Sequence, residues 1–391
     1  MFSKKFITFL LCIFCIFQTT FSNKNINSNF KWKLMLLKVF DKVRNNYVEK
    51  DIDQEKLIHG GIKGMLTTLN DPYTRFLEPK KHSEMQISLN GNFFGVGMYI
   101  GLKDDQLTII SPMDDSPAAK AGIKALDRII SIDAKTTEGL SLEEAVSKIR
   151  GPKGSKVVLS IKREGTKDTL IIPIIRDKIK IKSIETPQML TDNIGYLRLI
   201  SFENKNATKQ VRKAIQKLKK QGMQKLIFDL RNNGGGLLSN AIEISSLFLD
   251  DGTVVYTVDR EQHKISLPVH KNQKIFSGAL AVLINGASAS ASEILAGAIK
   301  DSNRGILVGT KTFGKASVQN IVSLDDGSAL LLTIAKYLTP AGHDINKTGI
   351  NPNYEAKIPT TDIKAMKDGN YIYNIKTDYQ IQKALKFLEN L

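Results

Sequence analysis

A lysine that follows two spaced glycines lies in the last third of the chain. The segment Gly309 to Lys315 reads G-x-x-x-x-G-K, the pattern of a phosphate-binding loop, and comes after an apolar run that predicts a strand. Such a loop also needs Ser or Thr directly after the lysine, and a helix that begins there. Here Ala316 follows, and β-branched residues with a turn at 325–327 predict a hairpin instead. We therefore interpret the nucleotide motif as accidental.

Three serines lie upstream, in the small-residue stretch 285–301, where an apolar strand leads directly into a helix. A serine on such a turn is exposed, and the N–H groups at the start of the helix favour a nearby anion. However, the letters SASE from Ser290 also form an S-x-x-E capping box, and on this segment alone an ordinary helix cap is favoured. Ser288 and Ser292 share the turn with Ser290, and the residues alone do not select one as a nucleophile.

A serine nucleophile needs a base, and histidine is the usual one. Among the chain's histidines, His343 beside Asp344 is the most suitable partner for a Ser-His triad. No pair of histidines has a metal-binding spacing such as H-E-x-x-H, which argues against a zinc enzyme. The full set is His59, His82, His263, His270 and His343.

Lys315 is the alternative base. To accept a proton, its amine must be neutral near pH 7, so its pKa must fall from about 10.4 to near 7. Burial lowers a lysine pKa by that much. Phe313, Ala316 and Val318 are apolar neighbours, and Gln319 can accept from the amine without adding a negative charge.

A glycine turn at 234–236 lies between a predicted strand and a predicted helix. Its N–H groups are natural donors to an oxyanion. A tight turn that has no room for a Cβ atom accounts for the same glycines without any chemistry.

The elements that must position these residues fall into three regions. Helical periodicity through Trp32–Val43 and Ile58–Leu69 predicts a helical N-terminal region over 30–85. Residues 91–176 predict a compact β-rich module with two helices. From 177 to 391 strands and helices alternate, which indicates an α/β layer architecture.

The length and the net charge of the chain indicate its number of domains and the character of its surface. The chain has 391 residues, enough for two or three domains, and a net charge of +17. The lysines are scattered and no aromatic residues interleave with them, so we interpret the positive charge as a basic solvated surface and expect no nucleic-acid partner.

The first 22 residues predict a secretory signal. Lys4 and Lys5 precede the apolar run Phe6–Phe17, which is short for a membrane span, and cleavage after Ser22 is expected. An uncleaved segment that anchors the protein in the membrane is the alternative. Both cysteines, at 12 and 15, lie in this run and are interpreted as apolar filler.

Taken together, "GASASASEILAGAIKD", "GTKTFGKASVQ", "FDLRNNGGGLL", "LNDPYTRFLEP", "GNFFGVGMYI" and "YLTPAGHDINKTGINPN" cover nearly the whole mature chain in order. This set resembles the carboxyl-terminal processing peptidases, the tail-specific serine proteases with a Ser-Lys dyad and a PDZ domain. The chain departs from the family at Gly234 (usually Pro), Ala316 (usually Gly), Ala125-Leu126 (usually Pro-Gly) and Asn70 (commonly Asp). These positions concern loop stiffness, since none carries a side chain with a chemical role.

The resemblance implies a crotonase/Clp-protease-like α/β core at 177–391, an inserted PDZ-like domain at 91–176 and a helical region at 30–85. It also implies a role for each site residue. Ser290 is the nucleophile, Lys315 the general base and Gln319 the residue that positions the lysine, while the N–H groups of Gly236 and Ala291 form the oxyanion hole. The PDZ-like loop that binds the peptide is Phe94, Gly95, Val96 and Gly97.

The implied function is an exported serine endopeptidase, in the periplasm or cell envelope, that recognises the exposed apolar C-termini of proteins and cuts near them without metal or cofactor. Arg163 is a candidate to assist the tail carboxylate. The alternatives are a non-catalytic or latent PDZ scaffold that needs a partner for activation, and an esterase. Pairing of the N-terminal helices in a homodimer, and an activating adaptor protein, stay open.

Overall fold

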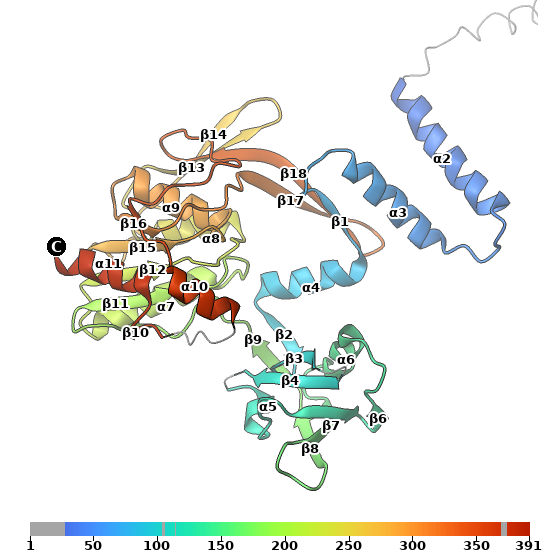
Figure 1. Cartoon of the computed structure of the whole chain (residues 1–391). Helices are drawn as coiled ribbons and strands as arrows, with labels where there is room; N and C mark the ends of the chain where they lie inside the picture. The colour runs from blue at the N-terminus through green and yellow to red at the C-terminus, as the bar shows by residue number, and fades with distance from the viewer. Residues whose placement is uncertain (1–27, 104–105, 114, 369–373) are drawn as a thin grey trace, which may run out of the picture. The chain divides into compact units, whose positions relative to one another are not determined.

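The computed structural model describes residues 28–103, 106–113, 115–368 and 374–391 (Figure 1). The expected signal segment 1–22 lies outside the described residues. The chain divides into two compact units, Met1–Glu78 and Pro79–Leu391, each described here by itself. Within the described ranges, none of the helices combines the length and the apolar character that a membrane span requires.

The first unit contains the two helices that the periodicity predicts, α2 (Ser28–Asn46) and α3 (Gln54–Thr67), followed by the short strand β1 (Arg75–Leu77). Asp53 caps α3, since its carboxylate accepts from the Lys56 N–H at 3.0 Å. The buried His59 packs against the Phe76 ring, with 4.7 Å between ring centroids. By contrast, large apolar side chains of α2 such as Trp32 are more than half exposed.

The second unit begins with α4 (Pro79–Asn90) and a β-rich module. An antiparallel sheet in the order β3-β4-β5-β7-β8 is its centre, β6 pairs with β5, and β2 pairs separately with β9. Alternate residues of β7, namely Val157, Leu159 and Ile161, are fully buried, as expected for a strand with one face toward a core. The predicted two helices are α5 and α6. The bounds are β2 (Asn92–Gly95), β3 (Met98–Lys103), β4 (Gln106–Pro112), α5 (Pro117–Lys120), β5 (Arg128–Ile132), β6 (Lys135–Thr136), α6 (Leu142–Ile149), β7 (Lys156–Lys162), β8 (Leu170–Ile175) and β9 (Asp177–Lys180).

The α/β part is a six-stranded sheet in the order β10-β11-β12-β15-β16-β19. All neighbours are parallel except β10, which is antiparallel to β11. Alternate strand residues face opposite sides: Phe228 and Val282 join the core formed with α7, α8 and α9, whereas Ile227 and Leu283 join the core formed with α11. The α/β prediction is confirmed. The bounds are β10 (Gln188–Met189), β11 (Ile194–Arg198), α7 (Ala207–Lys220), β12 (Lys225–Asp229), α8 (Leu238–Ser245), β15 (Leu280–Ile284), α9 (Ala291–Asp301), β16 (Ile306–Gly309), β19 (Tyr354–Glu355), α10 (Thr360–Lys367) and α11 (Tyr379–Glu389).

A second group of antiparallel strands comes from two segments that lie, along the chain, between strands of this sheet. The hairpin predicted after Lys315 is present as β17 (Ser317–Ser323) and β18 (Ala329–Leu338), and β18 also pairs with β13 (Thr253–Asp259). β13 in turn pairs with β14 (Lys264–Pro268), a strand that the sequence pattern did not predict because most of its side chains are exposed.

A buried ion cluster connects the end of β12 to the C-terminal helix. Arg231 pairs with Asp229 at 2.7 Å and with Asp378 at 2.9 Å, and the Tyr196 hydroxyl donates to Asp229 at 2.7 Å. Asp378 also caps α11 by accepting from the Ile381 N–H at 2.9 Å. Burial alone would lower the pKa of Arg231, but its bonds to Asp229 and the charge of Asp378 raise that pKa above its ordinary value.

We expect Arg231→Ala to lower the free energy of unfolding by about 3–5 kcal/mol, because it leaves two buried carboxylates without their cation. The matched control is Lys357→Ala, which removes the exposed ion pair with Glu355 (3.0 Å) and should cost less than about 1 kcal/mol. Urea unfolding of both variants measures this. Equal losses would mean that the buried cluster does not hold the fold together.

Candidate active site

The turn between β15 and α9 places Ser290 directly before the helix. Ser290 has φ 56° and ψ −115°, a left-handed conformation that non-glycine residues seldom adopt. Such strain persists only where the surrounding structure imposes it, and it concentrates at functional sites. Ser290 is half-buried, so its side chain remains accessible.

The two other serines of this turn have structural bonds. Ser288 is fully buried and its hydroxyl donates to the Leu230 carbonyl at 2.9 Å. Ser292 is also fully buried and donates to the Asn233 carbonyl at 2.9 Å. Both hydroxyls therefore fix the turn to the loop after β12, and Ser290 is the serine of the three without such a bond to a described residue.

The helix-cap interpretation of Ser290 is only half right. The Ser290 hydroxyl makes no cap hydrogen bond, and the Glu293 N–H donates instead to the Ser290 carbonyl at 2.8 Å. The reverse bond is present, since the Glu293 carboxylate accepts from the Ser290 N–H at 2.8 Å. The left-handed backbone explains the difference, because a helix N-cap normally has an extended backbone that directs its hydroxyl to the helix.

Glu293 is the centre of the site. Its side chain is fully buried and accepts four hydrogen bonds, two at each oxygen. Oε2 accepts from the N–H groups of Ser290 (2.8 Å) and Lys315 (2.9 Å), and Oε1 accepts from the Thr312 hydroxyl (2.6 Å) and the Gly314 N–H (2.7 Å). One carboxylate thus joins the serine turn to the lysine segment.

Burial raises the pKa of Glu293 above its ordinary value, although the four hydrogen bonds act in the opposite direction. A protonated carboxyl would present a donor to groups that are themselves donors, so the bonding pattern fits the carboxylate. The S-x-x-E motif identified Glu293 in the sequence, but only as a cap. Its bonds to residues 312–315 depend on the fold.

A second bridge joins the same two segments. Tyr337, on β18, is almost fully buried, and its hydroxyl lies 3.1 Å from the Ser290 carbonyl oxygen and also donates to the Lys315 carbonyl oxygen. Nothing in the sequence pattern distinguished this tyrosine from a core residue.

The glycine turn lies against Ser290. A Cβ atom on Gly235 (φ +99°) would come within 2.9 Å of the Ser290 Cβ, and one on Gly236 (φ +144°) within 2.3 Å of the Glu203 N. Only glycine fits at either position. Among the described residues, neither the Gly236 N–H nor the Ala291 N–H has an acceptor, so both are available to an oxyanion.

The lysine segment is not a phosphate-binding loop. Gly309 ends β16, the chain then runs without regular structure, and strand β17 begins at Ser317 where a P-loop would begin a helix. Lys315 is partly buried. The Gln319 side-chain amide donates to the hydroxyls of Ser317 (2.8 Å) and Thr333 (3.3 Å), so the bonds that the structure gives it lie next to the lysine segment.

The histidines lie in other settings. His343 is exposed in the turn after β18, and Asp344 beside it accepts from the Asn346 N–H instead. His263 pairs with Asp259 at 3.0 Å on an exposed hairpin. With Glu261, these two residues form a cluster whose side-chain atoms lie close enough together to hold a metal ion. None of the hydrogen bonds described for the five histidines reaches Ser290.

The expected peptide-binding loop is shorter than its four predicted residues. Phe94 and Gly95 belong to β2, opposite Lys178 and Asp177 of β9, so only Val96 and Gly97 form the turn into β3. Among the described residues, the N–H groups of these two have no acceptor. Two adjacent free N–H groups suit a carboxylate.

The suggestion that Arg163 assists the tail carboxylate is not supported. Its guanidinium is bidentate to Asp127, with both bonds at 2.7 Å, and also donates to the Gly122 carbonyl at 2.7 Å. Arg163 therefore has a structural role in the module.

Comparisons with known proteins agree with this architecture. A model of peptidase family S41 matches residues 193–356, a PDZ-domain model matches 108–163, and a model of the N-terminal domain of the activating protease CtpB matches 18–81. The carboxyl-terminal-processing protease of Picosynechococcus sp. is 39% identical over 88% of this chain and 82% of its own length. CtpA, a carboxy-terminal processing protease of Bacillus subtilis, is 37% identical over 90% of this chain and 76% of its own.

A solved S41 protease structure from Bacteroides fragilis has the same fold, with a TM-score of 0.52 at 17% identity over 90% of this chain and 97% of that one. With relatives this similar over most of its length, the chain belongs to the S41 family of carboxyl-terminal processing proteases and is a serine-type peptidase with a PDZ domain.

Proposed function

We propose that the chain cleaves peptide bonds with a Ser290–Lys315 dyad and recognises the C-terminal tails of its substrates. The observation that carries the proposal is the shared carboxylate. Glu293 binds the N–H groups of both residues through one oxygen, while the hydroxyls of Ser288 and Ser292 are bonded elsewhere.

In the first half of the reaction, the Ser290 Oγ attacks the carbonyl carbon of the substrate and the neutral Lys315 amine takes the hydroxyl proton. The substrate's carbonyl oxygen becomes an oxyanion, which the Gly236 and Ala291 N–H groups stabilise. The C–N bond then breaks, and the protonated Lys315 gives its proton to the leaving amine. This leaves an ester between Ser290 and the N-terminal part of the substrate.

In the second half, Lys315 takes a proton from a water molecule, whose oxygen attacks the ester carbonyl. The Ser290–carbonyl bond breaks, and Ser290 recovers its proton from Lys315. No metal or cofactor enters these steps. Gln319 is proposed to orient Lys315 from the adjacent strand.

Glu293 is proposed as a positioning residue. Its four bonds set where the Ser290 and Lys315 backbones lie relative to each other, and hence where both side chains begin. A misplacement of about 1 Å costs on the order of 10²-fold in rate. Because both oxygens of the carboxylate are engaged by N–H and O–H donors, the carboxylate holds this geometry.

Tail recognition is proposed for the PDZ domain. A peptide added as a strand beside β3 would bring its C-terminal carboxylate to the Val96 and Gly97 N–H groups. Export through the segment 1–22, retention of that segment as an anchor, pairing of α2 and α3 with a second copy, and an adaptor protein are proposals that rest on the sequence alone.

Ser290→Ala and Lys315→Ala should each abolish cleavage of a disordered protein with an apolar C-terminal tail, because each removes one half of the dyad. Mass spectrometry of the fragments measures this. Ser288→Ala is the matched control, since it removes a hydroxyl from the same turn and should affect stability more than the chemical step. Cleavage by Lys315→Ala would assign the base elsewhere, with His343 as the next candidate. Tail binding without cleavage by the intact chain would favour the latent scaffold.

Glu293→Gln should lower kcat by about 10²-fold with little change in KM, because the new NH₂ group opposes two of the four donors. At low pH, kcat/KM of the intact enzyme should fall more steeply than that of the variant, because burial raises the pKa of Glu293 and so brings its protonation to a higher pH than that of an ordinary glutamate. The variant lacks this titrating group. Unchanged kcat in a less stable variant would restrict Glu293 to the fold.

Amidation of the substrate's C-terminus should slow cleavage by about tenfold or more, because a neutral amide cannot replace the carboxylate at the Val96 and Gly97 N–H groups. The comparison uses one peptide with a free and with an amidated end, followed by the initial rate. A short ester substrate that bypasses the PDZ domain is the control. Equal rates for both peptide ends would contradict recognition of the tail.

A further inference from the structure

Four lysines form a stripe along α7. They are Lys209, Lys213, Lys217 and Lys220, at spacings of four, four and three residues, so all four project within roughly 80° of one another around the helix. The buried residues of the helix, including Val211, Ala214, Ile215 and Leu218, occupy the opposite side. The stripe therefore faces away from the sheet that α7 covers.

The stripe has no ion pair among the described residues, although Lys209 and Lys213 line the same surface hollow as Asp115 and Asp177. All four lysines are exposed, and none has an ion pair or side-chain hydrogen bond to a described residue. The helix contains no Asp or Glu, so like charges face each other at i,i+4, an arrangement that destabilises a helix. An ordinary solvated helix face mixes both signs, and this one does not.

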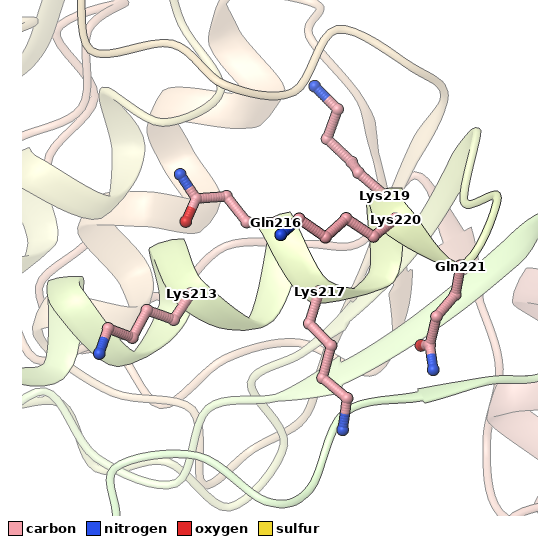
Figure 2. Close-up of a pocket in the computed structure, with 6 residues that line it drawn as sticks. All are labelled: Lys213, Gln216, Lys217, Lys219, Lys220 and Gln221. Carbon is pink, nitrogen blue, oxygen red and sulfur yellow. The ribbon is translucent and has the colours of Figure 1, made fainter.

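The flanking basic residues behave differently. The Arg212 guanidinium donates to the Gln273 side chain at 2.6 Å, and the Lys219 amine donates to the Ile275 carbonyl at 3.1 Å. Figure 2 shows Lys213 and Lys217 extending from the same side of α7, whereas Lys219 extends from the other side, around a surface hollow. Two basic residues thus attach α7 to the 273–275 segment, and the four of the stripe remain for a partner.

We propose that this lysine stripe is a docking face for an anionic lipid bilayer. The four amines span about 16 Å along the helix, a length over which a plane of lipid phosphates offers many partners without a fixed register. Lysine is a compact point charge on a flexible stem, suited to such a diffuse surface, whereas arginine would be expected where planar bidentate recognition matters.

Other anionic partners fit the stripe less well. A single-stranded nucleic acid uses aromatic side chains for base stacking, and α7 has none. An acidic protein usually binds around buried aromatic or apolar anchors, and the exposed side of α7 offers only lysine and Gln216. Charge complementarity with a membrane surface is the match that remains.

The test measures binding of the full chain to vesicles of phosphatidylcholine with and without about one third phosphatidylglycerol. The comparison is between the variant Lys209→Gln/Lys213→Gln/Lys217→Gln/Lys220→Gln and a control with the same charge loss in the β-rich module, Lys135→Gln/Lys156→Gln/Lys162→Gln/Lys167→Gln. Both keep the same N-terminal apolar segment, so the readout is the part of the binding that depends on phosphatidylglycerol and on salt.

Each basic residue near an anionic bilayer contributes about fivefold in affinity, so the stripe variant should lose at least about tenfold of that binding and the control much less. Thermal unfolding should stay unchanged in the control and should stay unchanged or rise slightly in the stripe variant, which loses its like-charge pairs, and cleavage of a short peptide should stay unchanged in both. Equal losses in the two variants, or no dependence on phosphatidylglycerol, would overturn the proposal. So would tighter binding of soluble polyglutamate than of vesicles at the same salt, which would point to an acidic protein.

Discussion

The buried carboxylate of Glu293 is the interaction on which the site depends. A fully buried acid is tolerated only when hydrogen bonds replace its hydration, and four donors from two segments of chain, the Ser290 turn and residues 312–315, converge on it. Removing any donor would leave an oxygen under-bonded in a dry interior. The carboxylate therefore holds the Ser290 and Lys315 backbones in place, and their N–H groups in turn offset the cost of burying the carboxylate.

The rest of the fold brings these donors to one place. Parallel strands end at a common edge, so the segments after β12, β15 and β16 emerge side by side and deliver the glycine turn, Ser290 and Lys315 in that order along the chain. The strained backbone of Ser290 follows from its fixed surroundings. Its N–H is held by Glu293, its carbonyl oxygen by Tyr337, and the turn itself by Ser288 and Ser292.

The sequence predicted what depends on local pattern. Alternation of strands and helices, the hairpin after Lys315 and the turn that carries Ser290 all follow from periodicity and turn residues, and all are present. Local pattern failed where a role depends on distant contacts. Glu293 looked like a helix cap because its partners at 312–315 are not its sequence neighbours. Phe94 looked like a loop residue because its partner strand β9 lies far along the chain. Tyr337 looked like any core tyrosine, since its contacts with Ser290 and Lys315 depend on the fold.

Glu293 and Tyr337 together fix the backbone of the Lys315 segment against the serine turn. Lys315 is flanked by the buried Gly314 and Ala316, and the N–H groups of Gly314 and Lys315 both donate to Glu293. Because both oxygens of Glu293 accept from main-chain N–H groups, its negative charge fixes the positions of the Ser290 and Lys315 backbones relative to each other.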